Sequence, residues 1–225
     1  MRNRVALILT NYNLPERADA LISAVRRNTL WPVDYFVVDN GSDIEKPSKY
    51  TTVWLKKNQQ TTAGWLAGLS AARDWGEYFA YWFLITSAEF PAGQGDPTPM
   101  VDFLMTNPDA VGIHPALTVD STTHWRHMIA RQDAEAGMQA PRQTWMMDNI
   151  ASMYRAEWFD GIGGFDPALK YAWGIDLETC WRARKQGRTL WIDERCRVKK
   201  VTDIGYTMQR MNMSGPARQV RATNN

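Results

Sequence analysis

Short apolar runs alternate with helix-like segments over the first 90 residues. Val5 to Leu9 is an uninterrupted aliphatic run, and similar runs return at 35–38 and 79–85. Such runs are typical of strands that are buried on both faces of a parallel sheet. Between them, apolar residues at helical spacing near 21–25 and an Ala- and Leu-rich segment at 63–75 predict two helices. This alternation predicts an α/β fold with a Rossmann-like, mostly parallel central sheet flanked by helices.

The pattern is weaker in the second half of the chain. It predicts a helix at Val101 to Met105, a strand at Ala110 to His114 and a polar helix at His124 to Gly137. A last short strand is predicted at 190–192. We therefore expect one domain over residues 1–204.

The segment from Ile175 to Gly187 has the clearest helical signal of this half. Leu177, Trp181 and Arg184 fall on one face, and Gly187 suits the position that ends a helix. The segment is therefore predicted to be a helix.

The composition excludes several classes of protein. The chain has 225 residues, of which 44% are hydrophobic and 22% charged, as in ordinary globular domains. Its longest apolar run, Tyr78 to Ile85, is too short to cross a membrane, and the basic N-terminus is followed by only a short apolar run, unlike a secretory signal. We therefore expect a cytoplasmic protein. Cys180 and Cys196 lack metal-ligand spacing and are expected to be reduced and buried.

The net charge of +2 hides a basic C-terminal end. Residues 195–225 contain seven Lys and Arg against one Asp, which gives +6 and leaves −4 for the rest. A basic terminus is commonly a solvated segment, and its functional alternative is to bind a polyanion such as a nucleotide or nucleic acid. We expect residues 205–225 to form a mobile basic tail.

Carboxylates at strand ends are the candidates for chemistry. The chain has no Gly-rich dinucleotide fingerprint after the first strand, no P-loop and no G-x-S-x-G elbow. Asp39 and Glu89 follow predicted strands, and Asp176 starts the predicted helix at 175–187. Such groups can bind a ribose or a divalent cation, or take a proton from a hydroxyl.

Five motifs in order along residues 4–202 resemble the family-2 glycosyltransferases. The first strand and the Thr10-Asn11-Tyr12 turn are similar to the family's opening segment. Val37 to Asp43 is similar to the family's second strand, and Asp39 is at the position that is expected to contact the nucleotide base. Asn58 to Ala72 follows the family pattern N-x-G-x-x-x-G-x-N-x-G-x-x-x-A, with Gly64 among the matching positions.

The strongest stretch of the resemblance lies near the C-terminal end. Gly163 to Asp166, followed by Trp173 to Gly187, is similar to the family's G-G-F-D and E-D-x-[DE]-L-x-x-R-x-x-x-G signature. Gly174 stands in place of the first acid, whereas Asp176 is at the position of the family's base.

The resemblance implies a GT-A fold and inverting transfer of a sugar from a nucleotide-diphospho sugar, with a UDP-sugar as the expected donor, to an acceptor hydroxyl. It implies that Asp176 is the base, and we expect its place at a helix N-terminus to keep it ionised at pH 7. The residues that it implies for binding the donor are Thr10, Asn11, Tyr12, Asp39, Asn40, Gly64, Ser87, Glu89 and Lys200. Those assigned to the acceptor are Trp173, Gly174 and Asp148.

The expected metal site departs from the family pattern. The D-x-D motif reads Ser87-Ala88-Glu89, and the usual His of V-x-H is replaced by Lys200. One carboxylate without a His binds Mg²⁺ or Mn²⁺ weakly. Two interpretations remain open: Lys200 or Lys199 replaces much of the metal's charge, or Glu89 and the diphosphate still hold Mn²⁺.

The acceptor is open at the level of sequence. A saccharide or lipid-linked glycan is the usual acceptor of the family. DNA with a hydroxymethylated base is the alternative, because the basic tail would meet phosphates. A second alternative is an inactive sugar-nucleotide-binding protein, since the D-x-D is altered. The sequence does not define the oligomeric state.

The 11 tryptophans divide into two groups. Those in predicted strands, such as Trp54, Trp82 and Trp191, are expected in the core, where a large aromatic ring fills the space between sheet and helix. Trp173 precedes Asp176 in a Gly-containing loop, so we expect it to stack on the acceptor.

Overall fold

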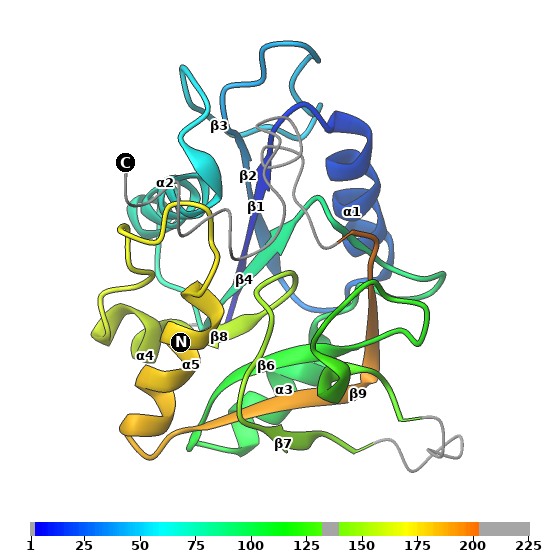
Figure 1. The fold of residues 1–225 in the computed structure, drawn as a ribbon, viewed down its shortest axis with the longest axis vertical. Coiled ribbons are helices and arrows are strands. Elements are labelled where there is room, and N and C mark those ends of the chain that lie inside the picture. The colour runs from blue at the N-terminus through cyan, green and yellow to red at the C-terminus, as the bar shows by residue number, and fades with distance from the viewer. Residues whose placement is uncertain (1–2, 132–139, 203–225) are drawn as a thin grey trace.

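The computed structural model describes residues 3–131 and 140–202. Its first half has the predicted alternation of strands and helices, shown in Figure 1. The elements are β1 (Val5–Asn11), α1 (Pro15–Asn28), β2 (Val33–Asp39), β3 (Val53–Trp54), α2 (Gln60–Trp75) and β4 (Ala80–Ile85). β1 pairs in parallel with β2 and β4, and β2 pairs in parallel with β3. The α/β fold is confirmed.

The two first helices cover opposite sides of this parallel group (Figure 1). The chain steps from β1 to β2 through α1, and then returns past β1 to β4 through α2. Because such crossovers are right-handed, opposite steps place the helices on opposite faces. Every residue of β1 is buried as a result, which explains its uninterrupted apolar run.

The second half of the described chain extends the sheet with mixed pairing. Its elements are β5 (Ala88–Glu89), α3 (Thr98–Thr106), β6 (Ala110–Leu117), the short 3₁₀ helix η1 (Arg126–Met128), β7 (Arg142–Thr144), β8 (Met153–Arg155), α4 (Ala156–Gly161), α5 (Ile175–Lys185) and β9 (Thr189–Lys200). The strand order is β3-β2-β1-β4-β8-β6-β9-β5, with β7 on β9. β8 is antiparallel to both β4 and β6, so the predicted parallel pairing dominates only from β1 to β4.

The polar helix predicted at His124 to Gly137 is wrong in the part that the structure describes. Only η1 is helical there, and residues 132–139 lie outside the described ranges. The chain becomes extended at Ile129, because Ile129 bridges to Leu117 and the Ala130 N–H donates to the Leu117 carbonyl at 2.7 Å. Pairing with β6 therefore replaces helical hydrogen bonds.

The last strand is much longer than predicted. β9 has 12 residues and bends along its course (Figure 1), and its register with β6 shifts between Pro115 and Ala116. The full length of β9 is not evident from the sequence, because the charged run Asp193-Glu194-Arg195 interrupts its apolar pattern. Asp193 and Glu194 are nevertheless buried, since arginines pair with both carboxylates.

The helix α5 exposes the face on which Leu177, Trp181 and Arg184 lie. The side chains of Leu177 and Trp181 are 43% and 56% exposed. The buried face is formed by small and compact residues, which are Ile175, Thr179, Cys180 and Ala183. The end of the helix is as predicted, because Gly187 has a φ of 70° and donates to the Arg184 carbonyl at 3.0 Å.

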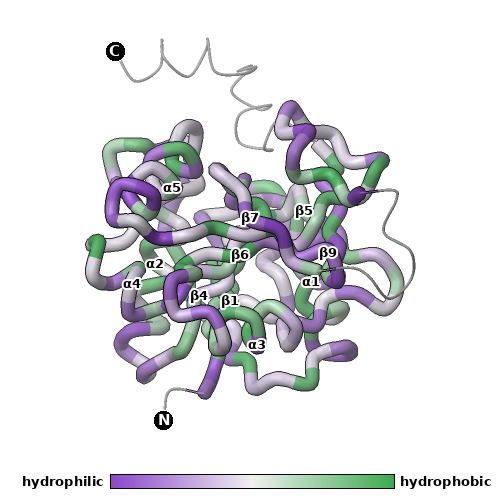
Figure 2. Tube along the Cα trace, turned by 90° about the horizontal axis from the view of Figure 1, so that it is seen from below, coloured by the Kyte–Doolittle hydropathy of each residue, from purple (hydrophilic) through white to green (hydrophobic). Residues whose placement is uncertain are grey.

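The core lies between the sheet and the helices, and Figure 2 shows hydrophobic stretches along the inner strands with hydrophilic segments on the outside. Trp82 is fully buried as predicted, and Trp191 packs partly buried against the core. Trp54 is 64% exposed, because β3 is a two-residue edge strand with nothing packed over it at this position. Both cysteines are buried and free, as predicted. Among the described helices, none combines the length and apolar character needed to cross a membrane.

The close packing of α2 on the sheet can be tested by a substitution at Gly68. A Cβ at this position would lie 2.6 Å from Cγ2 of Ile8 and 3.0 Å from Cγ2 of Val38. We expect Gly68→Ala to lower the free energy of unfolding by about 1–2 kcal/mol, because overpacking outweighs the gain in helix propensity. Gly76→Ala is the control, since no atom lies within 4 Å of its added Cβ. Equal urea midpoints for the two variants would show that this contact is not tight.

Candidate active site

The predicted donor residues lie at the carboxyl ends of the parallel strands, as the fold class requires. Asn11 ends β1 and pairs in register with Asp39, which ends β2. The Asn40 N–H donates to the Asn11 carbonyl at 2.8 Å, so the two strand ends are joined directly. The parallel register therefore brings these three predicted residues together.

Two buried polar atoms at the end of β1 lack a partner. Oγ1 of Thr10 and Nδ2 of Asn11 make no hydrogen bond with any residue that the structure describes. Gly64 of α2 packs directly on Thr10, because an added Cβ would lie 2.4 Å from the Thr10 Cγ2. A glycine here lets the helix approach the strand end closely.

Asp39 and Asn40 shape the loop after β2. The Asp39 carboxylate accepts hydrogen bonds from Ser42, from the hydroxyl at 2.6 Å and from the backbone N–H at 3.0 Å. The Asn40 amide donates to the Gln60 carbonyl at 2.9 Å, which ties this loop to the start of α2. Both side chains are almost fully buried, so they hold the loop in place.

Tyr12 and Asn13 tie the loop after β1 to the segment at 42–45. The Tyr12 hydroxyl donates to Asp43 at 3.0 Å. Oδ1 of Asn13 accepts three backbone N–H groups, those of residues 43, 44 and 45. Asn13 was not among the predicted site residues, and its φ of 54° is a feature that asparagine tolerates better than most residues.

The pairing of β5 with β9 brings the two altered motifs together. Ala88 pairs with Lys200, Glu89 pairs with Lys199, and the Val201 N–H donates to the Ser87 carbonyl at 2.9 Å. Residues over 100 positions apart in the sequence therefore form one end of the sheet. Each motif was recognised separately in the sequence, and only the structure shows that the two are in contact.

Lys199 and Lys200 point in different directions. Nζ of Lys200 lies 2.7 Å from Asp148, and both side chains are only 12% exposed. Nζ of Lys199 lies 2.5 Å from the exposed Asp120. Since neighbouring residues of a strand alternate between faces, only Lys200 faces the candidate site. This distinction favours Lys200 over Lys199 as the cation of the site.

The residues around Glu89 do not suit a resident divalent cation. Glu89 is exposed and pairs across the ladder with Lys199, so it lies on the face opposite to Lys200 and Asp148. Lys200 supplies an ammonium group where a metal would need a ligand. Among the residues that the structure describes, no cluster of three His, Cys, Asp or Glu could hold a metal ion.

Asp176 lies in the first turn of α5, half-buried beside the Asp148–Lys200 pair. Burial and the nearby charge of Asp148 raise the pKa of Asp176 to about 7, while Lys200 and the Leu177 N–H at 2.9 Å act in the opposite direction. The expectation that the helix start keeps this group fully ionised at pH 7 is therefore wrong. Desolvation and a like charge outweigh the helix dipole.

Glu178 and Arg182 explain the rest of the signature around Asp176. Their side chains form an ion pair at 2.6 Å, one turn apart on α5. Arg182 also donates to the carbonyls of Ile162 and Gly164, each at 2.8 Å. This pair anchors the G-G-F-D loop to α5, so these residues position the helix that carries Asp176.

Gly174 and Trp173 lie immediately before that helix. Gly174 has a φ of 81°, a left-handed conformation that favours glycine, and its carbonyl accepts the Glu178 N–H at 2.8 Å. A residue with a Cβ at this position would be strained. Trp173 is partly exposed and stays a predicted acceptor contact.

His114 is a residue of this region that the sequence did not single out. It is fully buried in β6, its Nδ1 lies 2.5 Å from the Pro115 carbonyl, and its Nε2 has no partner among the described residues. Burial lowers its pKa to about 4, and the charges of Asp148 and Lys200 act on it in opposite directions. A single histidine within a predicted strand does not indicate from the sequence that it lies near Asp148 and Lys200.

The like charge of Asp148 can be tested on Asp176. We expect Asp148→Asn to lower the pKa of Asp176 by at least about 1 unit, because it removes a negative neighbour while the positive charge of Lys200 remains. Carboxyl ¹³C chemical shifts followed against pH measure this pKa. Asp109→Asn is the control, since Asp109 is 83% exposed and pairs with Arg188. An unchanged or higher Asp176 pKa in Asp148→Asn would refute the coupling.

Comparisons with known proteins define the fold. No protein-family model matches the chain, and no curated protein matches it. Among solved structures, GalNAc-T7 with UDP, GalNAc and Mn²⁺ is similar with a TM-score of 0.66 and 12% identity over 86% of this chain and 43% of that one. The mannosyltransferase PcManGT from Pyrobaculum calidifontis, in complex with GDP-Man and Mn²⁺, has a TM-score of 0.64 and 15% identity over 94% of this chain and 61% of that one. The chain spans less than two thirds of either neighbour. Its mixed nine-stranded sheet with flanking helices is the GT-A fold of glycosyltransferases.

Proposed function

We propose that this protein is an inverting glycosyltransferase of the family-2 type, which moves a sugar from a nucleotide-diphospho sugar to an acceptor hydroxyl. The observation that carries the proposal is the half-buried Asp176 beside the Asp148–Lys200 pair, at the edge of a GT-A sheet. The UDP and GalNAc bound to one solved neighbour and the GDP-Man bound to the other support the donor class. A UDP-sugar is the donor that we expect.

Asp176 acts as the base in this reaction. Its carboxylate takes the proton of the acceptor hydroxyl while that oxygen forms a bond to the anomeric carbon. The bond between this carbon and the diphosphate oxygen breaks, and the diphosphate leaves with the electron pair. Attack from the opposite face inverts the configuration. A pKa of about 7 suits a base that works near neutral pH.

The donor occupies the carboxyl ends of β1, β2 and β4 in this proposal. The buried Thr10 and Asn11 supply polar atoms that have no partner among the residues the structure describes. The carboxylate of Asp39, already ordered by Ser42, faces the same strand ends. Preordered polar groups of this kind reduce the entropy that is lost when a ligand binds.

Lys200 supplies positive charge for the leaving diphosphate. It is largely buried, where a charge acts more strongly than in water. Both neighbours are described with Mn²⁺, whereas the residues around Glu89 that the structure describes do not suit a resident metal. We therefore assign the charge compensation to Lys200 rather than to a metal held by Glu89.

The catalytic role of Asp176 can be tested with a panel of sugar nucleotides. Release of the nucleoside diphosphate by the wild type identifies the donor, and we expect Asp176→Asn to lower kcat at least about 100-fold. The wild-type kcat/KM is expected to fall about tenfold per pH unit below 7, because only the ionised carboxylate accepts a proton.

Asp109→Asn serves again as the control and should retain wild-type turnover. Nucleotide binding to Asp176→Asn, measured by calorimetry, separates loss of chemistry from loss of the fold. Full turnover in Asp176→Asn excludes this base. Nucleotide binding without turnover by the wild type, with any donor and acceptor, would favour the inactive binding protein instead.

The role of Lys200 predicts that activity does not depend on a metal. Wild-type turnover in EDTA is expected to stay within about threefold of that with Mn²⁺, while Lys200→Ala loses about 10- to 100-fold, since one charged stabilising group is removed. Lys200→Arg keeps the charge and should recover part of the loss. Wild-type activity abolished by EDTA, or undiminished activity of Lys200→Ala in EDTA, would refute this role.

A further inference from the structure

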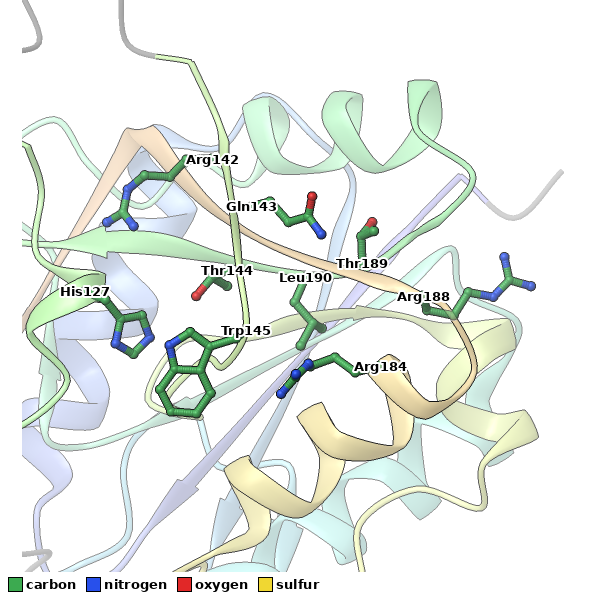
Figure 3. A pocket seen from close by; sticks show the side chains of 9 residues that line it. All are labelled: His127, Arg142, Gln143, Thr144, Trp145, Arg184, Arg188, Thr189 and Leu190. Atoms are coloured by element: carbon green, nitrogen blue, oxygen red, sulfur yellow. The ribbon is translucent and has the colours of Figure 1, made fainter.

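A cavity of about 370 Å³ lies beside the candidate active site, between α5, β7 and the start of β9 (Figure 3). We call it the arginine pocket, because Arg142, Arg184 and Arg188 are among its lining residues. Its lining contains no acidic residue. A volume of this size is typical of sites for small ligands or single units of a larger one.

Only one of these arginines is available to a ligand in the pocket. Arg142 pairs with the buried Glu194 at 2.6 Å, and Arg188 pairs with Asp109 and points away from the cavity (Figure 3). Arg184 points toward Trp145 (Figure 3) and makes no ion pair or hydrogen bond with a residue of the described ranges. A guanidinium that has no acidic partner among the described residues of its pocket is suited to an oxyanion.

An aromatic platform forms another wall of the pocket. Trp145 is 47% exposed, and its ring lies 5.1 Å from that of His127 at an angle of 30°. Trp125 supports both rings edge-on, with centroids 6.0 Å and 6.2 Å away. The rings of His127 and Trp125 therefore hold the exposed indole in one orientation, in which it can stack on a planar ring.

The pocket is linked to the candidate base through two segments. Trp145 precedes Asp148 by three residues, and Arg184 lies eight residues after Asp176 on the same helix, about 12 Å along its axis. Trp181 is 56% exposed on that helix, and Nζ of Lys185 lies 4.8 Å from the centre of its ring. The helix that carries Asp176 therefore also carries an exposed aromatic ring and basic side chains.

We propose that the arginine pocket binds a nucleotide of a nucleic-acid acceptor, with its phosphate on Arg184 and its base on Trp145. The inference rests on the proposed function, because it names the acceptor class of that site. A neutral glycan would use the aromatic ring but would have no need of the arginine, whereas aromatic stacking combined with basic groups is characteristic of single-stranded nucleic-acid sites. The spacing from Asp176 leaves room for about three nucleotides at 3.4 Å per base.

Binding of a labelled 12-nucleotide single-stranded DNA to the full chain, followed by fluorescence anisotropy at several salt concentrations, tests this inference. We expect Arg184→Gln to weaken binding about tenfold and to reduce the salt slope by about 0.7, as for one lost phosphate contact. Trp145→Leu should weaken binding about tenfold, and Trp145→Phe should retain most of it. Arg27→Gln is the matched control, because Arg27 is exposed in the last turn of α1, away from the carboxyl ends of the strands.

Absence of binding by the wild type, or equal affinities of Arg184→Gln and Arg27→Gln, would overturn the inference. Displacement of the DNA by inorganic phosphate or a phosphorylated sugar at comparable concentrations would overturn it too, since the pocket would then be a site for small anions. Donor hydrolysis by the wild type is measured in parallel. Hydrolysis without DNA binding refutes only the acceptor class, whereas DNA binding without turnover of any donor and acceptor refutes the proposed function and, with it, the role of DNA as acceptor.

Discussion

The ion pair between Lys200 and Asp148 is the interaction on which the rest of the candidate site depends. It joins the end of β9 to the loop between β7 and β8, and Asp176 lies beside it. Either charge alone would be costly at 12% exposure, so each requires the other. Burial raises the pKa of Asp176 most, and the pair adjusts it further, because Asp148 raises it and Lys200 lowers it. The candidate base is thus tuned by two residues that no local motif connects to it.

Pairing of buried charges also explains which parts of the fold could be predicted from the sequence and which could not. β1, β2 and β4 are lined by apolar residues on both faces, so their runs are visible in the sequence. In β9, Asp193 and Glu194 can be buried because they pair with arginines. These charged residues interrupt the apolar pattern by which a buried strand is recognised in a sequence. The buried face of α5 has a related cause. Its buried side uses Thr179 and Cys180, whereas the larger Leu177 and Trp181 remain exposed.

The candidate site was predictable where it follows from topology. Asp39 and Asn11 had to converge, since parallel strands end at the same edge of a sheet. The environment of Asp176 was not predictable, because its pKa depends on the distant Asp148 and on burial. His114 and the pocket around Arg184 were missed for the same reason. Their significance comes from neighbours that only the tertiary structure supplies.

Replacing a metal with Lys200 has a consequence for the chemistry of the proposed enzyme. A divalent cation would neutralise the diphosphate without engaging Asp148, whereas the single ammonium of Lys200 already neutralises Asp148. A bound diphosphate would therefore compete with Asp148 for this cation. As Lys200 turns toward the diphosphate, the negative charge of Asp148 acts more strongly on Asp176 and raises its pKa further. Donor binding would in this way make the ionised Asp176 a stronger base, and it would shift the pH range in which Asp176 is ionised upward.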